Sequence, residues 1–159
     1  PAVFGPVSID SLGSAGSLTV AGGSLNVAAG GMSLDSLAVT GGTLNNAGAT
    51  TAASFTQSGG TFAGTGAMAF ADFTQTAGTT NVGGDFTVSN SYAQTNPGVI
   101  NVGGNVSITH TAGPLVMGNL STTGNLSLTS LTGPISQAAG SALVAHGLTS
   151  ATASAGVLR

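Results

Sequence analysis

The fold is indicated by the stretch QTAGTTNVGGDFTVS, residues 75–89, because its pattern returns further along the chain. The next stretch, QTNPGVINVGGNVSIT, residues 94–109, has the same order of glutamine, glycine pair and alternating apolar residues. A shorter version, GNLSLT, occupies residues 124–129. Self-similarity at a fixed period of this length is typical of solenoid proteins, in which each repeat is one structural unit that stacks on its neighbours.

The residue after the second glycine changes from one repeat to the next. It is Asp85 in the first repeat, Asn105 in the second and Asn125 in the third. A loop that binds a cation or a phosphate needs its charged or hydroxyl ligand, yet this position loses its charge in two of these three repeats. We therefore interpret Asp85 as a turn residue of a repeating scaffold, and we expect no metal or cofactor at this position.

Glycine recurs at two positions in every repeat. One column is spaced by 18, 18, 18, 20 and 20 residues, and a second column precedes it by six or seven residues. We expect both columns to lie in turns that need either a positive φ or the absence of a side chain. The predicted turn glycines of the first column are Gly30, Gly48, Gly66, Gly84, Gly104 and Gly124. The second column contains Gly23, Gly42, Gly60, Gly78, Gly98 and Gly118.

Three short segments between the glycines alternate apolar with small or polar residues, as in Phe86-Thr87-Val88. Alternation with a period of two, bounded by Gly, Asn or Pro, predicts strands separated by turns. Three short strands in each coil of 18–20 residues predict an all-β fold, a parallel β-helix or β-solenoid of about seven or eight coils.

In such a fold each strand stacks about 4.8 Å from its counterpart in the next coil, so inward residues lie above their own copies. The sequence therefore predicts interior columns that run along the axis of the coil. The expected stacked core residues are Phe55, Phe73 and Tyr92 in one column, and Phe86, Val106 and Leu126 in another.

Side-chain amides also form columns. The asparagine column is interrupted by Ala63, and we expect it to form a ladder at a corner of the coil, where each amide donates to one neighbour and accepts from the other. Its members are Asn26, Asn45, Asn81 and Asn101. A glutamine column contains Gln57, Gln75 and Gln94. For the glutamines the sequence leaves two possibilities open, a second ladder or side chains that face solvent.

The repeats weaken toward both ends. We expect a single solenoid over residues 1–159, with an irregular first coil in 1–22, regular repeats in 23–135, and a degenerate last coil or a continuation in 136–159. Residues 5–9 match the pattern of Gly104–Ile108. The start at Pro1 has no signal-peptide pattern, and no amphipathic capping helix is evident. We therefore interpret the chain as a segment of a longer rod.

Composition excludes several classes of function. The 159 residues contain one Arg, no Lys, four acidic residues and no Cys, and the formal net charge is −3. Nucleic-acid binding needs several cationic contacts to phosphates, so no nucleic-acid partner is expected. A polybasic membrane patch is excluded for the same reason. The absence of cysteine rules out disulfides and thiolate metal sites.

The columns resemble the rod repeats of filamentous haemagglutinin-like exoproteins, large adhesins that Gram-negative bacteria export by two-partner secretion. The resemblance covers residues 54–156, and its clearest pieces are FTQSGGTFAG (55–64), DFTQTAGTTNVGGDFTVS (72–89) and GNLSTTGNLSLTSLTGPISQAAGS (118–141). It implies a right-handed parallel β-helix, an extracellular or cell-surface location, and a role in cell adhesion or biofilm matrix. It also implies an outer-membrane transporter as a partner during export. The secretion domain and the toxin tip of that family are not evident in this sequence.

Enzymatic activity is not expected. Some parallel β-helices cleave polysaccharides with clustered carboxylates, but Asp72 and Asp85 lie 13 residues apart in different columns. Polysaccharide lyases of this fold need an Arg or Lys base, and the only such residue is the terminal Arg159. His110 and His146 have no acidic partner at a telling spacing, so we interpret them as solvated strand residues.

Two functional hypotheses remain. The first is a structural or adhesive rod that acts as a shaft or spacer of a bacterial surface exoprotein, with host or neighbouring-cell surface molecules as partners. The second is a subunit that assembles with itself, end to end or laterally, into an extracellular filament or sheath. Few charges oppose such association, and unpaired strand edges favour pairing with another chain.

Overall fold

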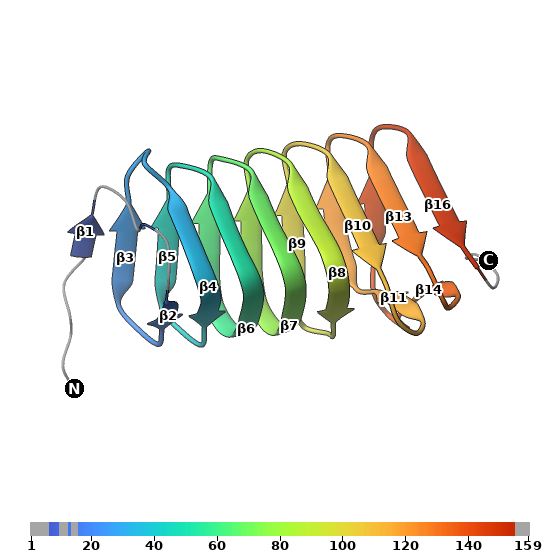
Figure 1. The fold of residues 1–159 in the computed structure, drawn as a ribbon, viewed down its shortest axis with the longest axis horizontal. Coiled ribbons are helices and arrows are strands. Elements are labelled where there is room, and N and C mark those ends of the chain that lie inside the picture. The colour runs from blue at the N-terminus through green and yellow to red at the C-terminus, as the bar shows by residue number, and fades with distance from the viewer. Residues whose placement is uncertain (1–6, 10–12, 14–15, 155–159) are drawn as a thin grey trace.

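The computed structural model describes residues 7–9, 13 and 16–154. The regular structure of these residues consists of strands that run parallel to their neighbours in the sheets. Figure 1 shows a coil that advances from left to right, with the nearer strands running down and the farther strands running up, which makes the coil right-handed. The predicted parallel β-helix is confirmed.

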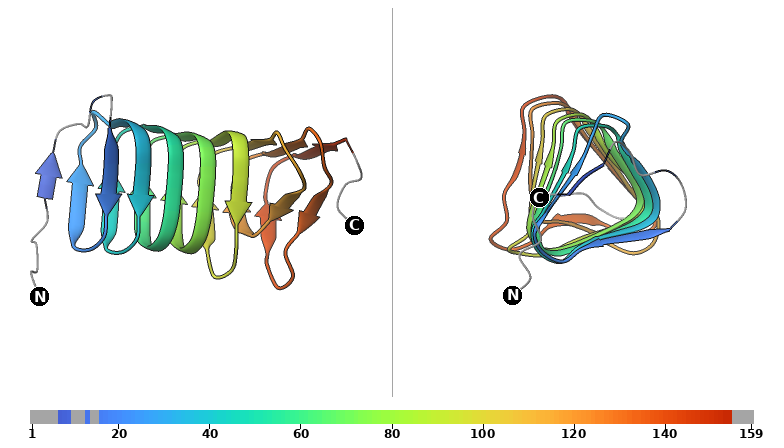
Figure 2. Two further views of the ribbon diagram at one scale, coloured as in Figure 1. Left: turned by 60° about the horizontal axis from the view of Figure 1, so that its bottom comes forward. Right: turned by 90° about the vertical axis from the view of Figure 1, so that its left-hand side faces the viewer.

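The coil has three faces, and its outline along the axis is triangular (Figure 2, right). In each coil the chain follows the first face, turns at a glycine, follows the second face, bends directly into the third and turns at another glycine. The longest strands therefore belong to more than one face. In particular, β6 (Thr50–Gly64) and β7 (Met68–Val82) each pass through all three faces.

The first face has eight parallel segments and so gives about seven turns of the coil. They are β1 (Val7–Ile9), β3 (Ser24–Val27), β5 (Thr43–Asn46), the ends of β6 and β7, β9 (Val99–Val102), β12 (Asn119–Thr122) and β15 (Leu143–Ala145).

The second face contains the starts of β4 (Met32–Val39), β6, β7 and β8 (Phe86–Gln94), followed by β10 (Val106–His110), β13 (Leu126–Ser130) and β16 (Thr149–Ala153). The third face contains β2 (Ser17–Val20), the ends of β4 and β8, and the middles of β6 and β7. Near β8, β11 (Leu115–Met117) pairs with β14 (Ile135–Gln137) as a separate two-stranded sheet.

The strand pairing corrects one expectation and refines another. Val7–Ile9 pairs with Leu25–Val27 on the first face, so the predicted alignment of residues 5–9 with Gly104–Ile108, on the second face, was wrong for the described residues. The third-face sheet ends at β8, so this face becomes irregular before residue 135. Residues 1–6, 10–12, 14–15 and 155–159, which belong to the expected irregular ends, lie outside the described part.

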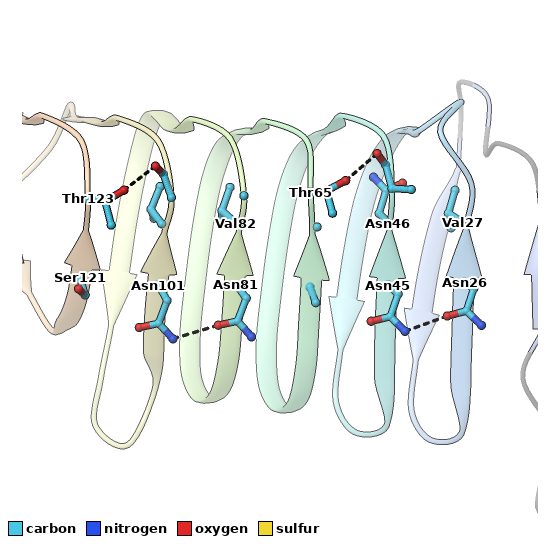
Figure 3. A pocket seen from close by; sticks show the side chains of 16 residues that line it. Asn26, Val27, Asn45, Asn46, Thr65, Asn81, Val82, Asn101, Ser121 and Thr123 are labelled. Carbon is cyan, nitrogen blue, oxygen red and sulfur yellow. Dashed lines mark hydrogen bonds between the residues drawn. The ribbon is translucent and has the colours of Figure 1, made fainter.

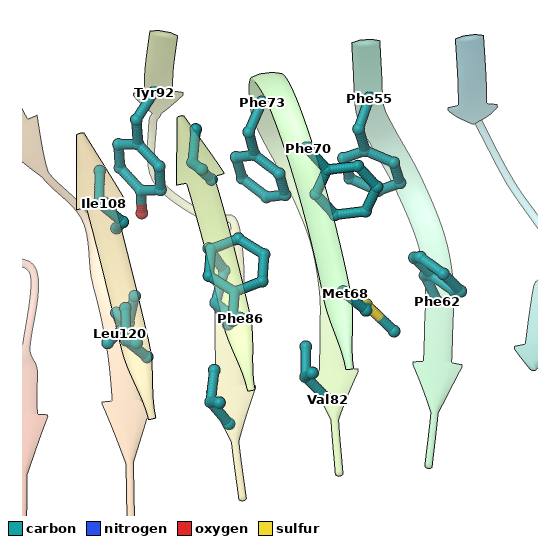
Figure 4. Packing of buried hydrophobic residues seen from close by; sticks show 14 of the residues in the cluster. Phe55, Phe62, Met68, Phe70, Phe73, Val82, Phe86, Tyr92, Ile108 and Leu120 are labelled. Atoms are coloured by element: carbon teal, nitrogen blue, oxygen red, sulfur yellow. The ribbon is translucent and has the colours of Figure 1, made fainter. Parts of the chain in front are cut away.

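The interior is filled by columns of apolar side chains. Phe55 stacks on Phe73 with 5.1 Å between ring centroids, and Phe73 stacks on Tyr92 at 5.5 Å (Figure 4). Phe86 meets the edge of Phe73 at 5.2 Å and 88°. Each such aromatic pair contributes about 0.5–1.5 kcal/mol beyond the burial of its surface. Stacked aromatic rings therefore hold together the centre of the rod.

The second predicted column continues on the second face. Phe86 pairs in register with Val106, and Val106 with Leu126. All three side chains are at most 1% exposed. Every residue proposed for the stacked core is thus buried and lies above its counterpart.

Among the described residues, no helix has the length and apolarity needed to cross a membrane.

We predict that Phe86→Asp unfolds the coils around β8, because it buries a charge among aromatic rings and the described residues contain no Lys or Arg to pair with it. The free energy of unfolding should fall by several kcal/mol, measured by urea denaturation followed by circular dichroism. The control Phe86→Leu, which stays apolar, should cost about 1 kcal/mol. Equal stability of the two variants would contradict the interior position of Phe86.

Candidate functional site

The glutamine column lies inside the coil, which decides between the two possibilities that the sequence left open. Gln57, Gln75 and Gln94 are 1%, 0% and 4% exposed. Gln75 donates from Nε2 to Gln57 Oε1 at 2.9 Å, and Gln94 donates to Gln75 Oε1 at the same distance. These three amides form a buried ladder along the axis.

The same amides also support the turns between the third and first faces. The two hydrogens of Gln75 Nε2 are shared by Gln57 Oε1 and two carbonyls, that of Gly78 in its own turn at 3.3 Å and that of Val99 in the next coil at 3.1 Å. Gln57 and Gln94 make equivalent pairs of bonds. Buried carbonyl groups need such partners, since leaving one unpaired costs about 1–3 kcal/mol. The ladder is therefore a structural element.

Two buried polar residues in apolar columns are explained by this ladder. Thr80 replaces the apolar residue of its column, and its hydroxyl donates to Gln57 Oε1 at 2.6 Å. The Tyr92 hydroxyl donates to Gln94 Oε1. Burial raises the pKa of the Tyr92 phenol well above its ordinary value, so this hydroxyl stays protonated and keeps its donor role.

The two histidines differ from each other. His110 is only 9% exposed, and its Nδ1 accepts a hydrogen bond from the Tyr92 backbone N–H at 3.2 Å. The expectation of a solvated residue was therefore wrong for His110, which packs where the pairing of β8 with β10 ends. His146 is exposed, with Nδ1 3.1 Å from the Thr122 carbonyl.

Members of both glycine columns lie where backbones of successive coils approach closely, and four members of the second column also have a positive φ. Gly23, Gly42, Gly60 and Gly78 adopt positive φ angles of 68°, 69°, 64° and 88°. At the predicted turn glycines the close approach by itself excludes a side chain. A Cβ on Gly66 would lie 2.5 Å from the Gly48 carbonyl oxygen, and a Cβ on Gly48, Gly84, Gly104 or Gly124 would lie within 2.8 Å of a backbone atom of the preceding coil. This column begins with Gly30 in the first coil. There the residue with a positive φ, of 74°, is its neighbour Gly31.

Asp85 and its counterparts connect successive coils at the corner between the first and second faces. Asp85 Oδ1 accepts from the Asn105 backbone N–H at 2.7 Å, and Asn105 Oδ1 accepts from the Asn125 N–H at 3.0 Å. Asn125 Oδ1 then accepts from the Leu148 N–H at 2.8 Å.

Within residues 7–9, 13 and 16–154, no three His, Asp or Glu side chains gather as metal ligands. Asp85 lies in a turn as predicted and also bonds the next coil.

The candidate functional site is a groove on the outside of the first face, with a volume of about 710 Å³. It runs across β3, β5, β6, β7, β9 and β12 (Figure 3). Its outward residues are small: Asn, Ala or Ser in the middle of each strand, and Ala, Thr or Gly toward the adjoining corner. Small side chains on a paired sheet leave a concave surface, which we call the first-face groove.

The asparagine column lines the first-face groove. Its residues lie in the middle of first-face strands and point outward, so the predicted position at a corner was wrong. Asn45 donates from Nδ2 to Asn26 Oδ1 at 2.8 Å, and Asn101 donates to Asn81 Oδ1 at 2.9 Å. The ladder thus consists of two halves, with Ala63 between them.

The first-face groove offers amide donors and acceptors, hydroxyl groups and methyl groups. None of the residues that line it carries a charge. Thr65 and Thr123 form part of the rim, and their hydroxyls donate to the carbonyls of Ala47 and Gly103 at 2.9 and 2.6 Å. Such a surface is suited to binding a neutral polar molecule.

Comparisons with known proteins found no matching family model, no similar curated protein and no similar solved structure.

We predict that Gln75→Leu destabilises the fold by about 2–4 kcal/mol, because the carbonyls of Gly78 and Val99 lose their buried partner. The matched exterior control is Asp85→Asn, which keeps the acceptor oxygen for the Asn105 N–H and should leave the melting temperature unchanged. Thermal and urea unfolding followed by circular dichroism measure both. A Gln75→Leu protein as stable as the wild type would show that the ladder contributes little.

Proposed function

We propose that this chain is a structural segment of an extracellular bacterial rod, the shaft or spacer of a surface exoprotein that serves cell adhesion or biofilm matrix. The observation that carries the proposal is the interior of the coil. Apolar columns and the glutamine ladder run along the axis through successive coils, so bending would open several stacked contacts at once. A stiff and extended element is what a spacer requires.

The outside of the rod supports the same role. The charged residues of the sequence are four acids and one arginine, and the described faces carry short polar side chains with Asn, Ser and Thr prominent. Such a surface depends little on salt or pH, which suits an exposed position outside the cell. The resemblance to filamentous haemagglutinin-like exoproteins adds export through an outer-membrane transporter and contact with host or neighbouring cells.

The second candidate, a self-assembling filament subunit, is favoured by the last described coil. Leu143, Ala145, Ala151 and Ala153 occupy positions whose counterparts in earlier coils are buried, yet they are half-buried. Leu148 is 77% exposed and Val144 43%. A further coil stacked on this surface, from a second copy, would cover Leu143, Ala145, Ala151 and Ala153 and pair the outer edge of β16.

We expect antibodies raised against the folded chain to label intact producing cells, because a rod of a surface exoprotein is accessible from outside. Immunofluorescence without permeabilisation measures this, with an antibody against a cytoplasmic enzyme as the control. Labelling that appears only after permeabilisation would rule out the extracellular role.

Electron microscopy over a concentration series distinguishes shaft from subunit. Seven steps of about 4.8 Å give a rod only about 35 Å long. Short particles at every concentration are the expected result for a shaft segment. Uniform fibres one rod wide, which lengthen as concentration rises, would instead favour the filament subunit.

A further inference from the structure

The two halves of the asparagine ladder have the same polarity. Asn45 donates toward Asn26, and Asn101 donates toward Asn81. Each amide therefore directs its nitrogen toward the N-terminal end of the rod and its oxygen toward the C-terminal end. The oxygen of Asn45 and the nitrogen of Asn81 consequently face each other across Ala63 (Figure 3).

Neither of these two atoms has a hydrogen-bond partner within residues 16–154. Asn45, Ala63 and Asn81 are in register on the adjacent strands β5, β6 and β7. Each asparagine is thus one strand spacing, about 4.8 Å, from Ala63, and the methyl group of Ala63 cannot bond to either. The space above Ala63 has the dimensions of one missing amide rung.

The missing rung has a definite chemistry. A group that completes it must donate to Asn45 Oδ1 on one side and accept from Asn81 Nδ2 on the other. A trans secondary amide does this, since its N–H and C=O point in opposite directions. The surrounding groove carries no charge and presents the methyl groups of Ala47 and Ala63. A neutral ligand with an amide and a methyl group fits these features.

We propose that the first-face groove binds an N-acetylated glycan by inserting an acetamido group between Asn45 and Asn81. The acetamido N–H donates to Asn45 Oδ1, the carbonyl accepts from Asn81 Nδ2, and the methyl group packs on the groove wall. Sugar hydroxyls meet the polar residues nearest this point, including Thr65.

A peptide fits the groove less well. Extended peptides bind chiefly through successive main-chain hydrogen bonds to a free sheet edge. Here β5, β6 and β7 are paired with each other and with β3 and β9 on both sides, so one isolated rung is all that the sheet offers. An acetamido group attached to a sugar ring needs only this one rung, that is, one hydrogen bond to Asn45 and one from Asn81, because the rest of the ring carries hydroxyl groups.

This inference goes beyond the role as a rod. Binding in the groove depends on residues outside the solenoid core, and it can fail while the rod is stiff and displayed on the surface. Equally, the groove can bind a glycan in a chain that is not a shaft. The two proposals are therefore tested separately.

The probe is N,N′,N″-triacetylchitotriose, titrated into the 15N-labelled wild-type chain, with the side-chain amide resonances of Asn45 and Asn81 as the readout. We expect saturable binding with a dissociation constant on the order of 1 mM, since a single rung in an open groove gives weak affinity. Cellotriose, which has the hydroxyls but no acetamido group, should shift these resonances far less.

The decisive variant is Ala63→Asn, which supplies the missing rung from the protein itself. It should weaken binding of the chitotriose at least tenfold while circular dichroism and melting show an intact or more stable fold. Ser121→Asn is the matched control, because it adds an amide beside Asn101 without filling the gap and should preserve binding.

Three results would overturn the proposal. The first is the absence of saturable shifts with the wild-type chain. The second is an unchanged affinity in Ala63→Asn, or equal binding of cellotriose, because the interrupted ladder would then not be the recognition element. The third is concentration-dependent dimerisation that Ala63→Asn abolishes, which would assign the rung to an amide of a second copy.

Discussion

The structure depends on one constraint, the stacking of each strand directly on its counterpart in the next coil at the spacing of a parallel sheet. Every side chain then has the same column neighbours along the axis, whether it points in or out. Inside, this favours rings that stack, as Phe55, Phe73 and Tyr92 do. At the corners it brings backbones so close that only glycine fits, as at Gly66.

The same constraint governs the buried polar groups. A turn between strands leaves carbonyls that point into the coil, and a buried carbonyl needs a donor. Gln75 shares its amide hydrogens among Gln57, its own turn and the next coil, while its oxygen accepts from Gln94. The long glutamine side chain can reach from the third face across to the first. The interior is therefore held by a polar ladder as well as by aromatic packing.

On the outside, stacking produces a different result. Outward residues need not fill space, so a run of small ones leaves a groove, and asparagines pair along it where they are adjacent. A single alanine among them leaves an acceptor and a donor facing each other. The solenoid thus combines a closed interior of stacked side chains with an exterior groove in which one acceptor and one donor are left facing each other.

The repeat in the sequence determined the solenoid, its strand spacing and the stacked core, because a period-two pattern in phase over many coils has few other solutions. It also indicated that Asp85 lies in a turn, since the same position holds asparagine elsewhere. Gln75 stands two residues after the core residue Phe73, so period-two alternation places it on the inward side of its strand and places Asn81, next to Val82, on the outward side. The tertiary structure alone decided that the inward amides bond one another and the carbonyls of the turns. Likewise, His110 is buried because it packs where the pairing of β8 with β10 ends. The groove at Ala63 exists only once distant coils are brought side by side.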